Sequence, residues 1–233
     1  MDIPVLMVDE VYHWGTLAVS QKGSRFSDSF EGHCLSVSRC PLAWLRIAKL
    51  GGSPLWRLTR RGGVFLDILS VGRNPELRQI IQDWGIARGY AENRTLWQAW
   101  SSDEDGEWRY MLFASEDEAR VEVVEDDEGP DGGDAVVPVE VLTGTALLCA
   151  RLGRARMEGQ DAFDFVAMVW AEDGHPALDG VWWGEVFDPD ALSAPRGGIF
   201  PGKVGSWTSA ESATYPGMDD EDSEGIIEKV IPA

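Results

Sequence analysis

The side chains best suited to chemistry lie in three separated segments. His13 lies in YHWGT, Ser36 and Ser38 lie in GHCLSVS, and Glu185 lies in DGVWWGEVF. Near neutral pH an imidazole can exchange protons or hold a polar ligand, and a carboxylate can stabilise positive charge. These segments therefore predict a polar site only if the fold brings them together.

The two serines belong to a segment that alternates apolar and small polar residues. This period of two predicts a strand, with Leu35 and Val37 facing the core and Ser36 and Ser38 sharing the other face. Neither serine lies in a GxSxG elbow, so a serine hydrolase is not expected. The alternative to a ligand site is an edge strand with one wetted face.

The neighbours of His13 and Glu185 extend the candidate site. Gly15 lets a ligand approach the backbone closely, and Thr16 supplies a hydroxyl group. Trp182 and Trp183 precede Glu185, where they could raise the pKa of this carboxyl group and form a flat pocket wall. The structural alternatives are a packed core histidine and a surface carboxylate on a hairpin.

The histidines and cysteines allow a zinc site as a minor alternative. The chain has three cysteines, and its candidate ligands cluster at His13, His33, Cys34 and Cys40. Their spacing does not match the paired motifs of structural zinc sites, so buried or idle thiols in a reducing cytosol are expected, and no metal. His175 lies in a predicted surface turn and is given no role.

The charge of the chain excludes several classes of partner. The 233 residues carry a formal net charge of −20 at pH 7, with 40 acidic and 20 basic residues. Such a field repels nucleic acids and anionic membranes and favours a basic partner protein. No apolar run reaches about 20 residues, and the first residues lack the basic region of a signal peptide, so a cytoplasmic location is expected.

Local patterns predict an α+β fold whose sheets are mostly antiparallel. Helices are expected from Pro41 to the Gly51-Gly52 pair and over 75–88, where Asn74 and Pro75 begin the helix. The segment 161–174 has helical spacing, with a strand as the alternative. Strands are expected over 5–8, 11–17, 34–38, 107–115 and 119–126, and on both sides of a turn at Gly62-Gly63. The segment 178–189 is expected to form a pair of strands.

The domain organisation is expected to be simple. One domain spans residues 1–208 and contains an acidic insertion around 125–134, which is rich in glycine and charge. The residues from 209 to 233 form an acidic tail that is poor in core residues and is expected to be partly mobile. The pair Asp179-Gly180 is expected to form a turn.

The order of these motifs resembles ADP-ribosyltransferase-like domains of the NAD-dependent toxin or effector type. YHWGT resembles the early YHGT motif of that family, EGHCLSVSRCPLAW resembles its strand-to-helix segment, and DGVWWGEVFDP resembles the late strand with its glutamate. The resemblance covers about two thirds of the chain. It implies a split β core with flanking helices, and NAD as a substrate.

The resemblance also implies a role for each matched residue. His13 would meet the adenosine ribose of NAD, Ser36 or Ser38 would line the nicotinamide pocket, and Glu185 would hold the 2′-hydroxyl of the nicotinamide ribose. The chain departs from the family in having Trp14 inserted into YHGT. The paired glutamate or glutamine of arginine-directed transferases is absent too, because Trp183 occupies its position.

The second motif also lacks the tyrosine that stacks on nicotinamide. Trp44, Trp182 or Trp183 would have to replace it.

Two classes of function remain open at this point. The first is an enzyme that transfers ADP-ribose to an unknown protein or other macromolecular acceptor. The second is a non-enzymatic acidic protein, such as an immunity protein, antitoxin, inhibitor or nucleic-acid mimic, that masks a basic partner. A third interpretation is a transferase fold that has lost its enzymatic activity and serves as a binding module.

Overall fold

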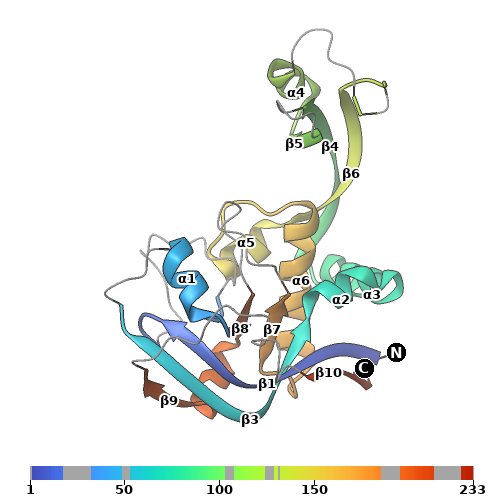
Figure 1. Cartoon of the computed structure of the whole chain (residues 1–233). Helices are drawn as coiled ribbons and strands as arrows, with labels where there is room; N and C mark the ends of the chain where they lie inside the picture. Colours follow the sequence, from blue (N-terminus) through green and yellow to red (C-terminus); the bar gives the residue numbers. More distant parts are fainter. Residues whose placement is uncertain are drawn as a thin grey trace.

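The chain folds into a mixed α and β structure from which a narrow arm projects (Figure 1). The structure is a computed structural model, and it describes residues 2–17, 33–48, 53–102, 108–123, 129–130, 132–184, 195–212 and 227–232. Its sheets contain antiparallel and mixed strands, which agrees with the expected mixture of helices and antiparallel strands. In the described part of the chain, no helix is both long enough and apolar enough to cross a membrane.

The main sheet is built on two long antiparallel strands, β1 (Asp2–Trp14) and β3 (Leu55–Asp67). The shorter strands are β2 (Leu35–Val37), β7 (Gly180–Trp183), β8 (Arg196–Ile199), β9 (Thr208–Glu211) and β10 (Ile227–Pro232). The strand order is β10-β1-β3-β7-β8-β2, with β9 paired to β3. Only the β3–β7 pair in this sheet, as described, is parallel.

Strand β2, which lies at one end of this order, also meets β1. Backbone hydrogen bonds of 2.8 and 2.9 Å join Tyr12 of β1 to Ser38, the residue that follows β2. The sheet therefore curls around a small apolar core to which β1, β2, β3, β7 and β8 all contribute. This core contains Leu6, Val8, Val11, Leu35, Val37, Leu58, Phe65, Trp182, Ile199 and Trp207.

The predicted turn at Gly62-Gly63 is wrong, because β3 runs through it as one strand. Val8 pairs with Gly63 and Glu10 pairs with Thr59, so the register shifts around Asp9. Gly62 adopts a positive φ of 65° and donates its N–H to the Asp9 carboxylate at 2.5 Å, which accommodates the bulge. The two separate strands expected before residue 17 are likewise one strand, β1.

A second and larger apolar core lies between the main sheet and the helices. Its centre is α6 (Gly159–Gly174), in which nine consecutive or nearly consecutive side chains are buried. The remaining helices are α1 (Pro41–Ala48), α2 (Ile68–Arg73), α3 (Pro75–Ala87), α5 (Ala146–Leu152) and the short 3₁₀ helix η1 (Pro201–Ser206). The alternative of a strand over 161–174 is excluded.

The start of α3 follows from its sequence. The Asn74 side chain accepts a hydrogen bond from the Leu77 N–H at 3.1 Å, and Pro75 occupies the first helical turn. Leu77 and Ile81 then lie four residues apart on the buried face. These local signals explain why the helix was predictable to within one residue.

Asp179 and Gly180 lie in the core, so the predicted surface turn is wrong. Asp179 is fully buried and forms an ion pair of 2.5 Å with Arg60 on β3, while it accepts the Val64 N–H at 2.9 Å. At Gly180 a Cβ atom would lie 2.0 Å from the Gly198 carbonyl oxygen. Only glycine therefore permits β7 and β8 to approach this closely.

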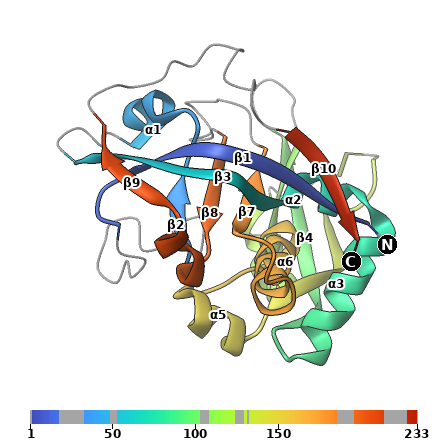
Figure 2. The same ribbon diagram turned by 90° about the horizontal axis from the view of Figure 1, so that it is seen from below.

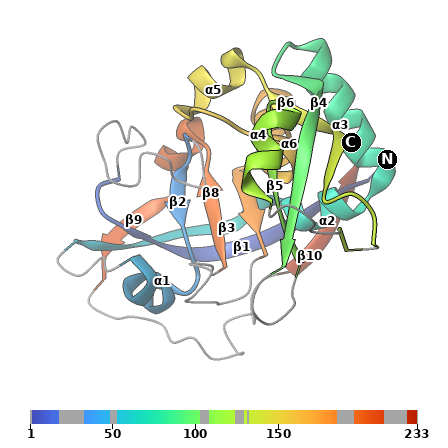
Figure 3. The ribbon, with the colours of Figure 1, turned by 90° about the horizontal axis from the view of Figure 1, so that it is seen from above.

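The projecting arm is a second sheet with one helix. Its strands are β4 (Ala91–Ser102), β5 (Trp108–Phe113) and β6 (Val136–Gly144), in the order β5-β4-β6, and its helix is α4 (Glu116–Glu122). Figure 3 looks down the arm onto α4 and β5. Strand β5 was expected from the sequence, whereas β4 was not.

The segment around α4 was expected to be a strand, and this is wrong. The Ser115 hydroxyl accepts the Glu118 N–H at 3.3 Å and begins a helix. Three acidic residues in the first turn stabilise this helix by interaction with its dipole. The valines that favoured a strand lie at its end, where Val121 is 81% exposed.

The last part of the chain extends the main sheet. Strand β9 pairs with β3, and β10 pairs with β1 in a register that joins Asp2 to Pro232 (Figure 2). These two segments of the expected mobile tail are therefore strands. Residues 213–226, and 125–128 and 131 of the expected insertion, lie outside the described residues.

Candidate functional site

His13 lies at the end of β1 and is directed at the backbone of its neighbours. Its Nδ1 atom is 2.6 Å from the Ser36 carbonyl oxygen, and its Nε2 atom is 2.9 Å from the Thr16 carbonyl oxygen. A neutral imidazole has one N–H and can donate to only one of these oxygens at a time. His13 thus links β1 to β2, and one contact must open before the ring can bind a ligand.

The protonation of His13 is set mainly by its burial. Burial lowers the pKa of this imidazole below its usual value, and the carbonyl oxygens of Ser36 and Thr16 offset this effect only in part. The ring is therefore neutral at pH 7. In this form it can act as a hydrogen-bond donor or acceptor, but not as a fixed positive charge.

The fold brings Ser36 and Ser38 beside the end of β1, which carries His13. Leu35 and Val37 point into the core as expected. The Ser38 hydroxyl is buried, donates to the Pro195 carbonyl at 2.6 Å and accepts the Cys40 N–H at 2.9 Å. Ser36 is half-buried, so it is the serine whose side chain retains access to solvent.

Gly15 and Thr16 form the turn that follows His13. Gly15 has a positive φ of 111°, donates its N–H to the Pro54 carbonyl at 2.9 Å and accepts the Trp56 indole N–H at 2.8 Å. The Thr16 side chain is exposed. The backbone of Gly15 is thus engaged within the protein, and Thr16 is the residue of the pair that a ligand can reach.

Trp182 and Trp183 do not form the expected pocket wall. Trp182 is 2% exposed and fills the curled sheet, where it packs edge-on against Phe65 at 5.7 Å. Trp183 points to the opposite face and lies in the larger core beside Phe165. Their adjacency in the sequence suggested one surface, but neighbouring residues of a strand face opposite sides.

Trp44 is the aromatic side chain that the fold brings to the serine strand. It lies on α1, is half-buried, and its indole N–H points to the Pro195 carbonyl at 3.4 Å. The Ser38 hydroxyl donates to the same carbonyl oxygen. Of the three tryptophans considered for stacking, Trp44 is therefore the one adjacent to the serines and not enclosed in a core.

Glu185 lies outside the described residues, whereas the strand that precedes it is described. Strand β7 ends at Trp183, which pairs with Arg196 of β8. The next residue of β8, Gly197, pairs with Val37 of β2. Strand β8 alone thus separates the end of β7 from the residues around Ser38. Because β2 and β7 are both antiparallel to β8, these two strands end at the same edge of the sheet.

A carboxyl group that the sequence did not single out lies beside Trp183. Asp164 on α6 accepts the Trp183 indole N–H at 3.3 Å and the Gln160 amide at 2.6 Å. Burial raises the pKa of Asp164 to about 6, and the two hydrogen bonds oppose this shift. The signal available in the sequence was an acidic residue within the apolar run AFDFVAMVW.

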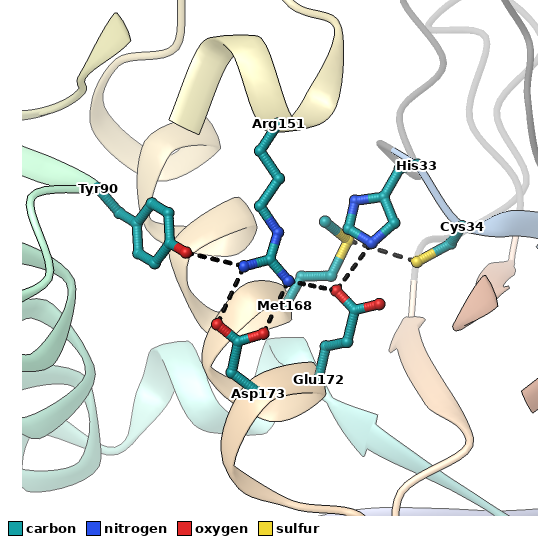
Figure 4. Close-up of polar contacts among 7 residues, drawn as sticks. All are labelled: His33, Cys34, Tyr90, Arg151, Met168, Glu172 and Asp173. Carbon is teal, nitrogen blue, oxygen red and sulfur yellow. Dashed lines mark hydrogen bonds and ion pairs between the residues drawn. The ribbon is translucent and has the colours of Figure 1, made fainter. Parts of the chain in front are cut away.

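The residues considered for zinc are engaged elsewhere. His33 lies 2.8 Å from the Glu172 carboxylate, and the Cys34 thiol lies 3.6 Å from the Met168 sulfur (Figure 4). None of the three cysteines, all of which lie in the described part of the chain, forms a disulfide bond. Within the residues that the structure describes, no group of three or more His, Cys, Asp or Glu side chains is arranged to hold a metal ion.

Figure 4 also shows a polar cluster that the sequence did not reveal. Arg151 on α5 donates to Asp173 at 2.8 and 2.9 Å, to Glu172 at 2.6 Å and to the Tyr90 hydroxyl at 2.9 Å. Burial alone would raise the pKa of Glu172, but hydrogen bonds from His33 and Arg151 outweigh it and lower this pKa. The cluster joins α5, α6 and the start of β2, so it positions the serine strand.

Taken together, the polar groups of the described residues gather at the edge of the sheet where β2 meets the last residues of β1. The accessible groups are the half-buried Ser36, the exposed Thr16 and the indole of Trp44. Comparison of the chain with protein families, with curated proteins and with solved structures finds no match. The functional argument therefore depends on the geometry of this edge and on the motifs.

Proposed function

We propose that this chain is an NAD-dependent ADP-ribosyltransferase-like enzyme that acts in the cytoplasm on an unidentified acceptor. The observation that carries the proposal is the contact between His13 and Ser36, which are 23 residues apart. It joins the first two motifs on β1 and β2, and β8 alone separates β2 from β7, the strand before Glu185. The curled sheet with flanking helices would then be a divergent form of the split β core.

The proposed reaction transfers ADP-ribose from nicotinamide to a nucleophile of the acceptor. The bond between C1′ of the ribose and the nicotinamide nitrogen breaks, and its electron pair leaves with nicotinamide. The ribose then carries positive charge, which the Glu185 carboxylate stabilises through the 2′-hydroxyl. The acceptor nucleophile forms the new bond to C1′ and releases its proton to solvent or a nearby base.

The described residues fit this substrate in part. Trp44 supplies an aromatic face for nicotinamide, and Ser36 supplies a hydroxyl group on the same side of the sheet. His13 can meet a ribose hydroxyl only if Nε2 releases the Thr16 carbonyl. Binding of NAD is therefore coupled to a rearrangement of the turn at Gly15 and Thr16.

The test measures nicotinamide release and label transfer from labelled NAD in the presence of cell lysate. Wild type is expected to release nicotinamide, and Glu185→Gln is expected to lower the rate by about 100-fold or more, since it removes the charge but keeps the shape. Glu211→Gln, at an exposed position of β9, is the matched control and should retain wild-type activity. Absence of release from wild type, or equal rates in both variants, would reject the proposal.

A second candidate function is non-enzymatic binding that masks a basic partner. It is favoured by the distribution of charge along the chain. Residues 91–144 contain sixteen acidic and three basic residues, a net charge of −13 out of the total of −20. Less than a quarter of the chain thus carries about two thirds of its net charge.

A further inference from the structure

The acidic stretch coincides with a structural unit. Residues 91–144 comprise β4, β5, α4 and β6, which form the arm that projects from the main body (Figure 1). Two of its three basic side chains, Arg94 and Arg120, are engaged in ion pairs with acidic residues of the arm itself. The described residues of the arm therefore carry a net negative charge, with seven acidic and three basic side chains.

One face of the arm sheet is covered and the other carries exposed aromatic side chains. Helix α4 covers the first face, where Ala99, Ala119 and Val136 are buried. Cross-strand pairing puts Trp100 opposite Tyr110, and Ser102 opposite Trp108, on the second face. The Trp100 and Tyr110 rings meet at 5.1 Å and 61°, while Trp108 and Tyr110 are 41% and 54% exposed.

A groove lies between β5 and the segment that leads into α6. It has a volume of about 520 Å³ and is lined by Tyr110–Phe113 on one side and by Arg156–Glu158 and Asp161 on the other. Its apolar lining comes from side chains such as Leu112 and Met157, and its rim carries Glu158 and Asp161. Arg156 is paired with Glu158 at 2.5 Å, so its positive charge is already matched.

The edge of β5 is open as well. In the described sheet β5 pairs with β4 on one side alone. An exposed edge strand with apolar side chains is a template for another extended chain, which would add its own backbone hydrogen bonds. The aromatic face and the edge of β5 thus form one surface, the β5 docking surface, defined by Trp100, Trp108, Tyr110 and Leu112. The groove adjoins this surface at Tyr110 and Leu112.

The charge of the arm decides which chain can occupy this surface. A second copy would bring the same net charge of −13 against it, and like charges at an interface oppose association. A basic segment would be attracted, and its lysine or arginine side chains could lie over the exposed aromatic rings while their stems cover apolar surface. Alternating apolar residues would fill the groove.

We propose that the β5 docking surface binds an extended, lysine- and arginine-rich segment of a partner protein. Like the second candidate function, this inference expects a positively charged partner. It does not depend on NAD or on Glu185. In a transferase this surface would recruit a basic acceptor; in a masking protein it would cover the partner's basic segment.

The test uses a fluorescein-labelled peptide of about eight residues in which arginine and leucine alternate, long enough to run along the six residues of β5. Anisotropy is measured without NAD at low and at physiological salt. We expect binding that weakens as salt rises. A matched peptide with glutamate in place of arginine should bind at least about tenfold more weakly.

Two comparisons, each between a double variant of the arm and a double variant of α3, locate the binding surface. Trp108→Ala with Tyr110→Ala is expected to weaken peptide binding by about tenfold or more, whereas Ile80→Ala with Ile86→Ala, at exposed apolar positions of α3, should leave it unchanged. Asp117→Asn with Glu118→Gln on α4 should weaken binding more than Glu76→Gln with Asp83→Asn on α3. All four positions of the charge variants are exposed, so folding should be retained.

The outcomes separate this inference from its rivals. Equal loss in the α3 and arm variants would show general attraction to an acidic protein and would overturn the proposal. Self-association that disappears in Trp108→Ala with Tyr110→Ala, measured by sedimentation, would assign the surface to a second copy and would also overturn it. Peptide binding by wild type together with absent nicotinamide release would keep this inference and reject the transferase.

Discussion

At the scale of the residue, Asp164 shows how burial changes a carboxyl group. Its pKa is raised from 3.8 to about 6 by burial within α6, beside the Trp183 indole. The folded protein therefore holds this proton more tightly than the unfolded chain does. The stabilisation from neutral Asp164 is complete below about pH 4 and is lost as the pH rises through about 6.

We predict that Asp164→Asn removes this pH dependence. The difference in the free energy of unfolding, variant minus wild type, should be larger at about pH 8 than at about pH 4 by about 1–3 kcal/mol. The reason is that the amide does not ionise, whereas the carboxyl group does. Urea denaturation at the two pH values measures this difference. Asp83→Asn, at an exposed position of α3, should show no such improvement, and the same change in both variants would refute the explanation.

His13 shows which features of the candidate site depend on the tertiary structure. The sequence singled out both His13 and Ser36 as candidate site residues, and in the fold both ring nitrogens of His13 face carbonyl oxygens of the protein. The side chains were chosen from residue types and motifs, whereas the partner atoms could not be. Hydrogen-bond partners depend on backbone positions that no residue type encodes.

At the scale of the element, the Arg151 cluster fastens α5 to the end of α6. Arg151, Glu172 and Asp173 have side chains that are 24%, 21% and 30% exposed, so solvent screens their ion pairs only in part. The hydrogen bond from Arg151 lowers the pKa of Asp173 against the opposing effect of burial. The ion pairs are therefore complete above about pH 4.5 and are lost on acidification.

We predict that Arg151→Met lowers the free energy of unfolding by about 1–3 kcal/mol, because it leaves two partly buried carboxylates without their cation. Thermal or urea denaturation at pH 7 measures the loss. Arg94→Met removes an ion pair whose arginine is 62% exposed and should cost less than about 0.5 kcal/mol. A cost for Arg151→Met as small as that of this control would show that the cluster does not fasten the helices.

Elements with strong local signals were predicted well. The cap at Asn74 and Pro75, the alternation at Leu35–Val37 and the apolar spacing of α6 are contained within a few residues. Helix α4 was missed because its valines favour a strand by propensity, while the Ser115 cap favours a helix. Strand β4 was missed because its pairing with β5 and β6, and not its own pattern, makes it a strand.

At the scale of the whole molecule, the net charge of −20 opposes the compact state through self-repulsion. We predict that raising sodium chloride from about 0.01 to about 0.1 M increases the midpoint of thermal unfolding by a few degrees. The screening length falls from roughly 30 to 10 Å over this range. Potassium chloride should act equally, because screening depends on ionic strength; an unchanged or lower midpoint would contradict this account.

The sequence alone determined the acidic character of the protein, helices α1, α3 and α6, and the segments that carry candidate chemistry. These properties depend on composition and on hydrogen bonds and side-chain spacing within one or two turns. It also gave the chain order of the candidate site residues, which is His13, then the serines, then Glu185.

The tertiary structure alone decided which of these residues meet and what surrounds them. It continued β3 through Gly62-Gly63, enclosed Trp182 in the curled sheet and brought Trp44 beside Ser38 instead. It also gathered the acidic stretch into an arm with an open strand edge. Strand pairing and burial depend on residues far apart in the chain, so no local pattern contains them.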